Sequence, residues 1–229
     1  MSRRVLIIAD SRGYKLQDVL NEYIDFDFKI SYHRGAKIEE ACLLSLRDLY
    51  SHKPDIIILM AGICQVTKKI NRNKHELMFN SKTRVINDYI ASLRVARDTI
   101  HHYCKQRNIK IPRLTLATQT GADLARQNKQ RRKHPQQKKL NRIIIRLNKM
   151  MVQLNSSCNI PTIWLSKFIH RYSSIKGKYH SGYRGLKDGI HPSTSLVHKW
   201  AKEINRGCRK IFGLEHANIR NVLKITFDT

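Results

Sequence analysis

A serine near the amino terminus and an Asp-x-x-His segment near the carboxyl terminus carry side chains suited to covalent chemistry. Ser11 follows an apolar run directly, and Asp188 stands three positions before His191. A serine hydroxyl becomes an effective nucleophile when an imidazole takes its proton and a carboxylate fixes the tautomer of that imidazole. Taken singly, Ser11 could instead cap the helix that follows it, and Asp188 and His191 could be loop residues bonded to the backbone. The elements that carry these residues must decide between the two interpretations.

Apolar runs rich in β-branched residues alternate with segments of helical periodicity, a pattern typical of a parallel sheet covered on both faces. The predicted strands are Arg4–Ala9, Phe28–Tyr32, Ile56–Met60, Arg113–Thr118 and Thr162–Leu165. The predicted helices are 16–23, 38–49, 82–106, 140–154 and 194–212. We therefore predict a single α/β domain over residues 1–229, a three-layer α/β/α sandwich of about five parallel strands. Its chemistry belongs at the carboxyl ends of those strands.

Two stretches do not fit this alternation. Residues 119–139 do not resemble core, and we interpret them as a basic insertion outside the loops that carry Ser11, Asp188 and His191. Residues 166–187 are polar and contain glycine, which predicts a long loop.

Four short signals fall at the predicted strand ends: Ala9-Asp10-Ser11, Gly35, Ala61-Gly62-Ile63-Cys64 and Asp188-Gly189-Ile190-His191. In this order they resemble the SGNH (GDSL-like) hydrolase superfamily, whose fold is flavodoxin-like. The resemblance spans nearly the whole chain. It implies that Ser11 is the nucleophile, His191 the base and Asp188 the carboxylate partner. It also implies an oxyanion hole formed by the backbone N–H groups of Ser11 and Gly35 together with the residue at position 64.

The chain departs from the family pattern at two of these signals. Ala9 replaces the glycine before Asp-Ser, a small change at a strand end. Cys64 stands where the family has an asparagine whose amide helps to hold the oxyanion, and a thiol is a weak donor. Loss of one such donor typically costs about 3 kcal/mol of transition-state stabilisation. Gln65 could supply a replacement amide, whereas a nucleophilic role for Cys64 lacks a cationic setting in the local sequence, so we expect a buried small residue.

Positive charge is concentrated in one part of the chain. Lysine and arginine number 44 against 17 acidic residues, a net charge of +27, and residues 124–187 hold sixteen of the basic residues and no acidic residue. Such an excess favours a polyanionic partner, and nucleic acid before a membrane surface. The alternatives are a solvated loop or a nuclear-import signal. The candidate nucleic-acid-binding residues are Arg126, Lys129, Arg131, Arg132, Lys133, Lys138, Lys139, Arg142, Arg146 and Lys149.

Other features exclude several classes of protein. The amino-terminal apolar run is too short for a signal peptide, and no run is long enough to span a bilayer. Five scattered cysteines without a Cys-x-x-Cys pair indicate reduced thiols, hence an intracellular protein, cytoplasmic or nuclear, with no metal site. The sequence contains no phosphate-binding glycine motif, so a nucleotide cofactor is not indicated.

The sequence thus predicts an intracellular serine esterase that hydrolyses an acyl or acetyl ester and carries a basic surface for nucleic acid or another polyanion. In character it is similar to the SGNH-like esterase domains of some non-LTR retrotransposons. The alternative is a catalytically impaired SGNH scaffold that binds nucleic acid.

Overall fold

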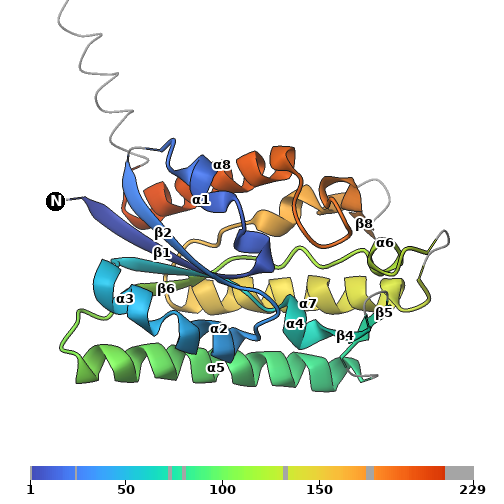
Figure 1. The fold of residues 1–229 in the computed structure, drawn as a ribbon, viewed down its shortest axis with the longest axis horizontal. Coiled ribbons are helices and arrows are strands. Elements are labelled where there is room, and N and C mark those ends of the chain that lie inside the picture. Colours follow the sequence, from blue (N-terminus) through green and yellow to red (C-terminus); the bar gives the residue numbers. More distant parts are fainter. Residues whose placement is uncertain are drawn as a thin grey trace, which may run out of the picture.

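The computed structural model describes residues 2–23, 25–71, 74–78, 81–130, 134–173 and 178–214. A parallel sheet with strand order β2-β1-β3-β6 forms its centre. The strands are β1 (Arg3–Asp10), β2 (Phe26–His33), β3 (Ile56–Met60) and β6 (Arg113–Leu116). Each crossover between parallel strands requires a covering segment, and helices lie on both faces of the sheet (Figure 1). The predicted α/β/α class is confirmed.

The two faces of the central strands supply two apolar cores. Leu6 and Ile8 of β1 point to one core, whereas Val5, Ile7 and Ala9 point to the other. All five residues of β3 are buried, as expected for an inner strand with helices on both sides. The sheet is therefore fixed by side-chain alternation along strands that are buried on both faces.

Helices close each core. The first core is covered by α2 (Ile38–Leu44), α3 (Leu46–His52), α4 (Ile63–Val66), α5 (Lys82–Gln106) and α7 (Gln137–Ser157), and the second by α1 (Leu16–Leu20) and α8 (Thr194–Ile211). The predicted helix 82–106 agrees with α5, and 194–212 agrees with α8 to one residue. Ser45 divides the predicted helix 38–49 into α2 and α3. No helix among the described residues is long and apolar enough to cross a bilayer.

The fifth predicted strand is reduced to one β-bridge between Ala117 and Ile163. The outer edge of β6 is occupied by a side chain instead. Asn155 of α7 accepts a hydrogen bond from the Leu116 N–H (3.0 Å) and donates one to the Leu116 carbonyl (2.9 Å). Because the helix satisfies this edge, the sheet described here has four strands.

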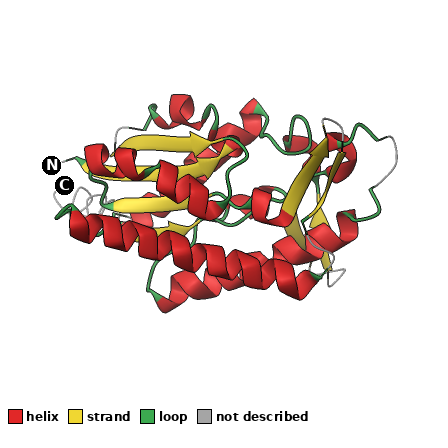
Figure 2. Cartoon of the chain, turned by 60° about the horizontal axis from the view of Figure 1, so that its bottom comes forward, coloured by secondary structure: helices red, strands yellow, loops and turns green. Residues whose placement is uncertain are grey.

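Two antiparallel hairpins lie beyond the carboxyl end of the sheet (Figures 1 and 2). One pairs β4 (Thr67–Asn71) with β5 (Lys74–Leu77), and the other pairs β7 (His170–Ser173) with β8 (Lys178–Ser181). The second hairpin and two short 3₁₀ turns, η2 (Leu165–Phe168) and η3 (Tyr183–Gly185), occupy the region 166–187 that we predicted as a loop.

The prediction that residues 119–139 lie outside the core is wrong for the first half of that stretch. Gln119, Thr120, Ala122 and Leu124 are at most 2 % exposed. Asn148 of α7 accepts from the Gln119 N–H (2.6 Å) and donates to the Gln119 carbonyl (2.8 Å), so polar residues are held inside by paired amides. A short helix, α6 (Leu124–Gln127), follows, whereas Arg131, Arg132 and Lys133 lie outside the described residues.

Candidate active site

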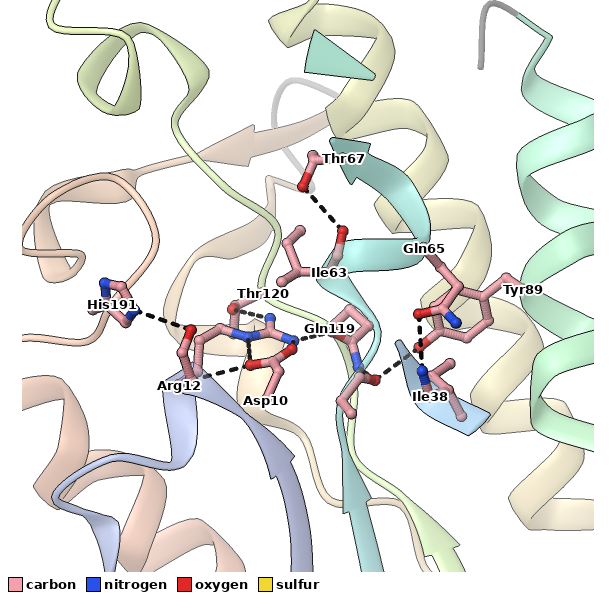
Figure 3. A network of polar contacts seen from close by, with 12 residues as sticks. Asp10, Arg12, Ile38, Ile63, Gln65, Thr67, Tyr89, Gln119, Thr120 and His191 are labelled. Carbon is pink, nitrogen blue, oxygen red and sulfur yellow. Dashed lines mark hydrogen bonds and ion pairs between the residues drawn. The ribbon is translucent and has the colours of Figure 1, made fainter. Parts of the chain in front are cut away.

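Ser11, His191 and Asp188 form a chain of hydrogen bonds at the carboxyl end of β1. His191 Nε2 lies 3.0 Å from Ser11 Oγ, and His191 Nδ1 lies 2.6 Å from Asp188 Oδ2. Figure 3 shows the His191 ring directed toward the turn that carries Asp10 and Arg12. Residues separated by 180 positions are thus brought to one point, in the order that a nucleophile, a base and its carboxylate partner require.

The Asp188 carboxylate also organises its own loop. Its Oδ1 accepts hydrogen bonds from the backbone N–H groups of Ile190 (3.1 Å) and His191 (2.8 Å), which turns the loop so that Oδ2 faces the imidazole. Burial raises the pKa of Asp188, but the hydrogen bonds from His191 and Ile190 outweigh it and hold this pKa below its usual value. The Asp188 carboxylate is therefore ionised at neutral pH and can act as the negative partner of the imidazole.

The turn after β1 places the Ser11 hydroxyl. Asp10, not Ser11, caps the 3₁₀ turn η1 (Ser11–Gly13) by accepting from the Arg12 N–H. The Ser11 side chain is left to contact His191, so the interpretation of Ser11 as a helix cap is not what the structure has. Gly13 packs against the strand end so closely that a Cβ there would lie 2.6 Å from the Ala9 Cβ. A side chain larger than that of Ala9 would push this turn away.

A buried ion pair that we did not predict from the sequence adjoins Ser11. Arg12 and Asp10 are 2 % and 0 % exposed, and the guanidinium donates to the carboxylate from Nε (2.8 Å) and Nη2 (2.6 Å). The remaining guanidinium contacts reach Gln119 Oε1 (2.6 Å) and Thr120 Oγ1 (3.2 Å). Arg12 thereby fastens the turn that carries Ser11 to the segment that follows β6 (Figure 3).

The same network reaches the end of β3. Gln119 Nε2 donates to the Ala61 carbonyl (2.8 Å), which also accepts from the Tyr89 hydroxyl (3.3 Å). Gly62 has a φ of +130°, and a Cβ there would lie 2.5 Å from the Tyr89 oxygen. Only glycine allows this close approach. An arginine two positions after a strand-end aspartate was the one signal that could have revealed the network.

The two other predicted oxyanion residues, Gly35 and Cys64, follow the ends of β2 and β3. Gly35 lies in the turn after β2 with a φ of +74°, next to Arg34. Cys64 lies in α4 and is half-buried, and the charges of Asp10 and Arg12 act on its thiol. Burial raises the pKa of Cys64 to about 11, and although Arg12 counteracts this, the thiol stays protonated at neutral pH. A thiolate nucleophile is therefore not formed there.

The suggestion that Gln65 replaces the missing asparagine is wrong. Its side chain is 0 % exposed and points to the helices that cover the first core. Gln65 Oε1 accepts from the Ile38 N–H (3.1 Å), and Nε2 donates to Glu39 Oε2 (2.7 Å) and to Ser92 Oγ (3.3 Å). With its donors and acceptor engaged, this amide joins α4 to α2 and α5. Figure 3 shows the contact with Ile38.

An open cleft of about 640 Å³ lies at the Ser11 hydroxyl. Its wall comes from the η1–α1 segment, from Arg34, and from the segment between Lys187 and Val197. Ser11, Asp188 and His191 are all part of the lining, whereas Gly35 and Cys64 are not among the described residues that line it. The cleft gives a substrate direct access to the serine.

Part of the basic region supports the triad loop, so the expectation that it lies outside the site is wrong. The Asp123 N–H donates to the Gly189 carbonyl (2.7 Å), and Arg126 Nη1 donates to the Leu186 carbonyl. A Cβ at Gly189 would lie 2.6 Å from the Asp123 carbonyl. The segment before α6 is therefore packed against the loop that carries Asp188 and His191.

Four of the other described candidates for nucleic-acid binding form a row on one face of α7. These exposed residues are Lys138, Arg142, Arg146 and Lys149. Lys129 is exposed after α6, and Lys139 is half-buried.

Among the described residues, no three His, Cys, Asp or Glu side chains gather as a metal site would require.

Comparison with solved structures identifies the fold. A lipase/acylhydrolase from Enterococcus faecalis aligns with a TM-score of 0.59 at 17% identity, covering 89% of this chain and 94% of that one. A GDSL-like lipase from Bacteroides thetaiotaomicron aligns with a TM-score of 0.56 at 14% identity (91% and 88%), and the acetyl xylan esterase AlAXEase with 0.55 at 17% (88% and 97%). Protein-family models and curated sequences gave no match. At such identities the likeness concerns the fold, which is that of the GDSL-like SGNH hydrolases.

Proposed function

We propose that the protein is a serine hydrolase that cleaves acyl or acetyl esters with Ser11 as nucleophile, His191 as base and Asp188 as the carboxylate partner. The observation that carries the proposal is the pair of hydrogen bonds from Ser11 through His191 to Asp188, at the mouth of an open cleft. The shared fold with lipases, acylhydrolases and an acetyl xylan esterase supports the reaction class.

In the first half-reaction Ser11 Oγ attacks the ester carbonyl while His191 Nε2 takes the hydroxyl proton. Asp188 keeps the Nδ1–H oriented and stabilises the imidazolium. When the tetrahedral intermediate collapses, the imidazolium gives that proton to the departing alkoxide, and an acyl-serine remains. In the second half-reaction a water molecule gives a proton to Nε2 and attacks the acyl carbon. Ser11 recovers its proton as the carboxylic acid leaves.

The oxyanion in this scheme is held by the backbone N–H groups of Ser11 and Gly35, with the Cys64 thiol in place of a stronger amide donor. The Arg12 guanidinium does not take over this task, since its contacts go to Asp10, Gln119 and Thr120. We therefore expect a slower enzyme than one with an asparagine at position 64.

Hydrolysis of p-nitrophenyl acetate tests the proposal. The parent protein should release p-nitrophenol, and Ser11→Ala and His191→Ala should each lower kcat by roughly a thousandfold or more. Ser195→Ala, an exposed serine of α8, is the matched control and should keep the parent rate. Parent-like turnover in Ser11→Ala would overturn the assignment.

We also propose that the exposed row Lys138, Arg142, Arg146 and Lys149 binds a polyanion, with nucleic acid as the first candidate. The supporting observation is that four cations share one face of α7 within a stretch of sequence that contains no acidic residue. An impaired scaffold that only binds would show this binding and no hydrolysis.

A further inference from the structure

The cleft at Ser11 is lined by cations that the esterase chemistry does not use. Lys15 and Arg34 stand on one side of it, and Lys187 on the side of the triad loop. All three residues are exposed, and none of them takes part in an ion pair among the described residues. Three positive charges therefore face the space that an ester substrate must enter.

The Tyr14 ring contacts two of these cations. The Lys15 ammonium lies 5.9 Å and the Arg34 guanidinium 5.7 Å from the centre of the Tyr14 ring, distances at which a cation is attracted to an aromatic face. Tyr14 also packs edge-on against Tyr32, with 5.9 Å between ring centres. Both contacts favour side-chain conformations that keep the two charges beside the cleft.

The backbone at Lys15 is unusual as well. Its φ of +66° lies in the left-handed region, where a lysine is less stable than glycine or asparagine. The conformation places the lysine side chain on the cleft wall, three positions before Asp18 and four after Ser11.

Two carboxylates also line the cleft. Asp188 is engaged by the His191 imidazole and by two backbone N–H groups. Asp18 is exposed and is the one acid of the lining that is not part of the triad. Away from the Asp188–His191 pair, the described lining thus carries three cations against one anion.

We infer that the natural substrate is an ester that carries an anionic group, a phosphate or a carboxylate, within a few ångströms of the scissile bond. This inference rests on the proposed esterase function. The scissile carbonyl lies at Ser11, and the anionic group lies among Lys15, Arg34 and Lys187. An arginine and two lysines suit both kinds of anion, and they outnumber Asp18, whose charge would repel an anion.

Matched aryl acetates test this inference. The probes are 3-acetoxybenzamide, 3-acetoxybenzoate and 3-acetoxyphenyl phosphate, which share the acyl group and differ in charge. We expect kcat/KM to be about tenfold higher for the anionic esters than for the amide at low ionic strength. Added sodium chloride should remove most of that preference and leave the neutral ester unaffected. The two anionic arms decide between carboxylate and phosphate.

Substitutions of the three cations test whether they cause the preference for anionic esters. Lys15→Asn, which keeps a residue suited to the left-handed region, Arg34→Gln and Lys187→Gln should each lower the anionic-to-neutral ratio of kcat/KM by about threefold. Asp18→Asn should raise this ratio. Lys105→Gln, an exposed lysine of α5 away from the cleft lining, is the control and should keep the parent ratio.

The same measurements separate an error in the substrate class from an error in the esterase function. Equal kcat/KM for the neutral and anionic esters, or a ratio that Lys15→Asn, Arg34→Gln and Lys187→Gln together do not change, would overturn the substrate class and leave the esterase intact. No hydrolysis of any of the three acetates would overturn the esterase and the substrate class with it.

Discussion

The immediate neighbours of Ser11 show how single residues hold the candidate nucleophile. Removing a guanidinium and a carboxylate from water is costly, and the Asp10–Arg12 pair offsets that cost with several direct hydrogen bonds. Burial lowers the pKa of Arg12, but the adjacent Asp10 charge more than restores it, so the guanidinium remains charged. The pair stabilises the tight turn beside Ser11 and leaves the serine hydroxyl free to meet His191.

At this scale Cys64→Asn tests the oxyanion hole. An amide is a stronger donor than a thiol, so we expect kcat for p-nitrophenyl acetate to rise by roughly tenfold or more. Cys158→Asn, an exposed cysteine, is the control and should leave kcat unchanged. An unchanged or lower kcat in Cys64→Asn would mean that position 64 does not face the oxyanion.

The loop that carries Asp188 and His191 depends on an element far away in sequence. The segment that begins α6 bonds to Gly189 and Leu186 on either side of Asp188. Sequence reasoning found Ser11, Asp188 and His191 because their residue types are tied to chemistry and to strand ends. It missed this support because Asp123 and Arg126 act through backbone carbonyls, which no residue pattern reveals. For the same reason it missed Asn155, whose amide takes the place of a fifth strand at Leu116.

Arg126→Met tests this support. Arg126 is a positioning residue, so its loss should let the His191 loop drift and lower kcat by about tenfold or more, with a smaller change in KM. Arg126→Lys should recover part of the rate. Lys105→Met serves as the control for lost charge. A parent-like kcat in Arg126→Met would show that the loop is held without this contact.

A buried acid fastens helix α8 to the segment Trp164–Lys167. Glu203, 3 % exposed, pairs with Arg206 (2.8 Å) and Lys167 (2.5 Å) and accepts from the Trp164 N–H (3.2 Å). Burial raises the pKa of Glu203, but these partners outweigh it and lower the pKa. Its stabilisation is therefore present above the unfolded-state pKa of about 4.3 and is lost as the pH falls through the lower folded-state value.

Glu203→Gln should thus lower the free energy of unfolding at neutral pH by about 2 kcal/mol and make stability less dependent on pH below about pH 5. Urea unfolding of parent and variant at several pH values measures both effects. Asp98→Asn removes an exposed partner of Arg97 and is the control. An equally steep loss of stability with acid in Glu203→Gln would contradict the assignment.

Across the whole molecule, the basic region and the candidate active site are in contact, although the sequence suggests that they are separate. The basic region divides into a part that supports the triad loop, at α6, and an exposed row on α7. Composition alone predicted the excess of charge but not this division, because lysines and arginines in a loop and on a helix face look alike in sequence.

Nucleic-acid binding tests the α7 row. Replacement of Lys138, Arg142, Arg146 and Lys149 with glutamine should flatten the log–log salt dependence of binding by about 3 units, at ~0.7 to 0.9 per phosphate neutralised. A charge-matched control replaces the exposed lysines Lys82, Lys105, Lys199 and Lys202. If both variants change the slope equally, binding reflects net charge and not this face.

The central claim is that Ser11 is a nucleophile activated by His191, and covalent labelling with a fluorophosphonate tests it most directly. Intact-mass and peptide-mapping measurements should find one phosphonyl group, located on Ser11. Labelling should disappear in Ser11→Ala and His191→Ala while both variants keep the parent circular dichroism spectrum. A folded parent protein that remains unlabelled, or a label that persists in Ser11→Ala, would contradict the account.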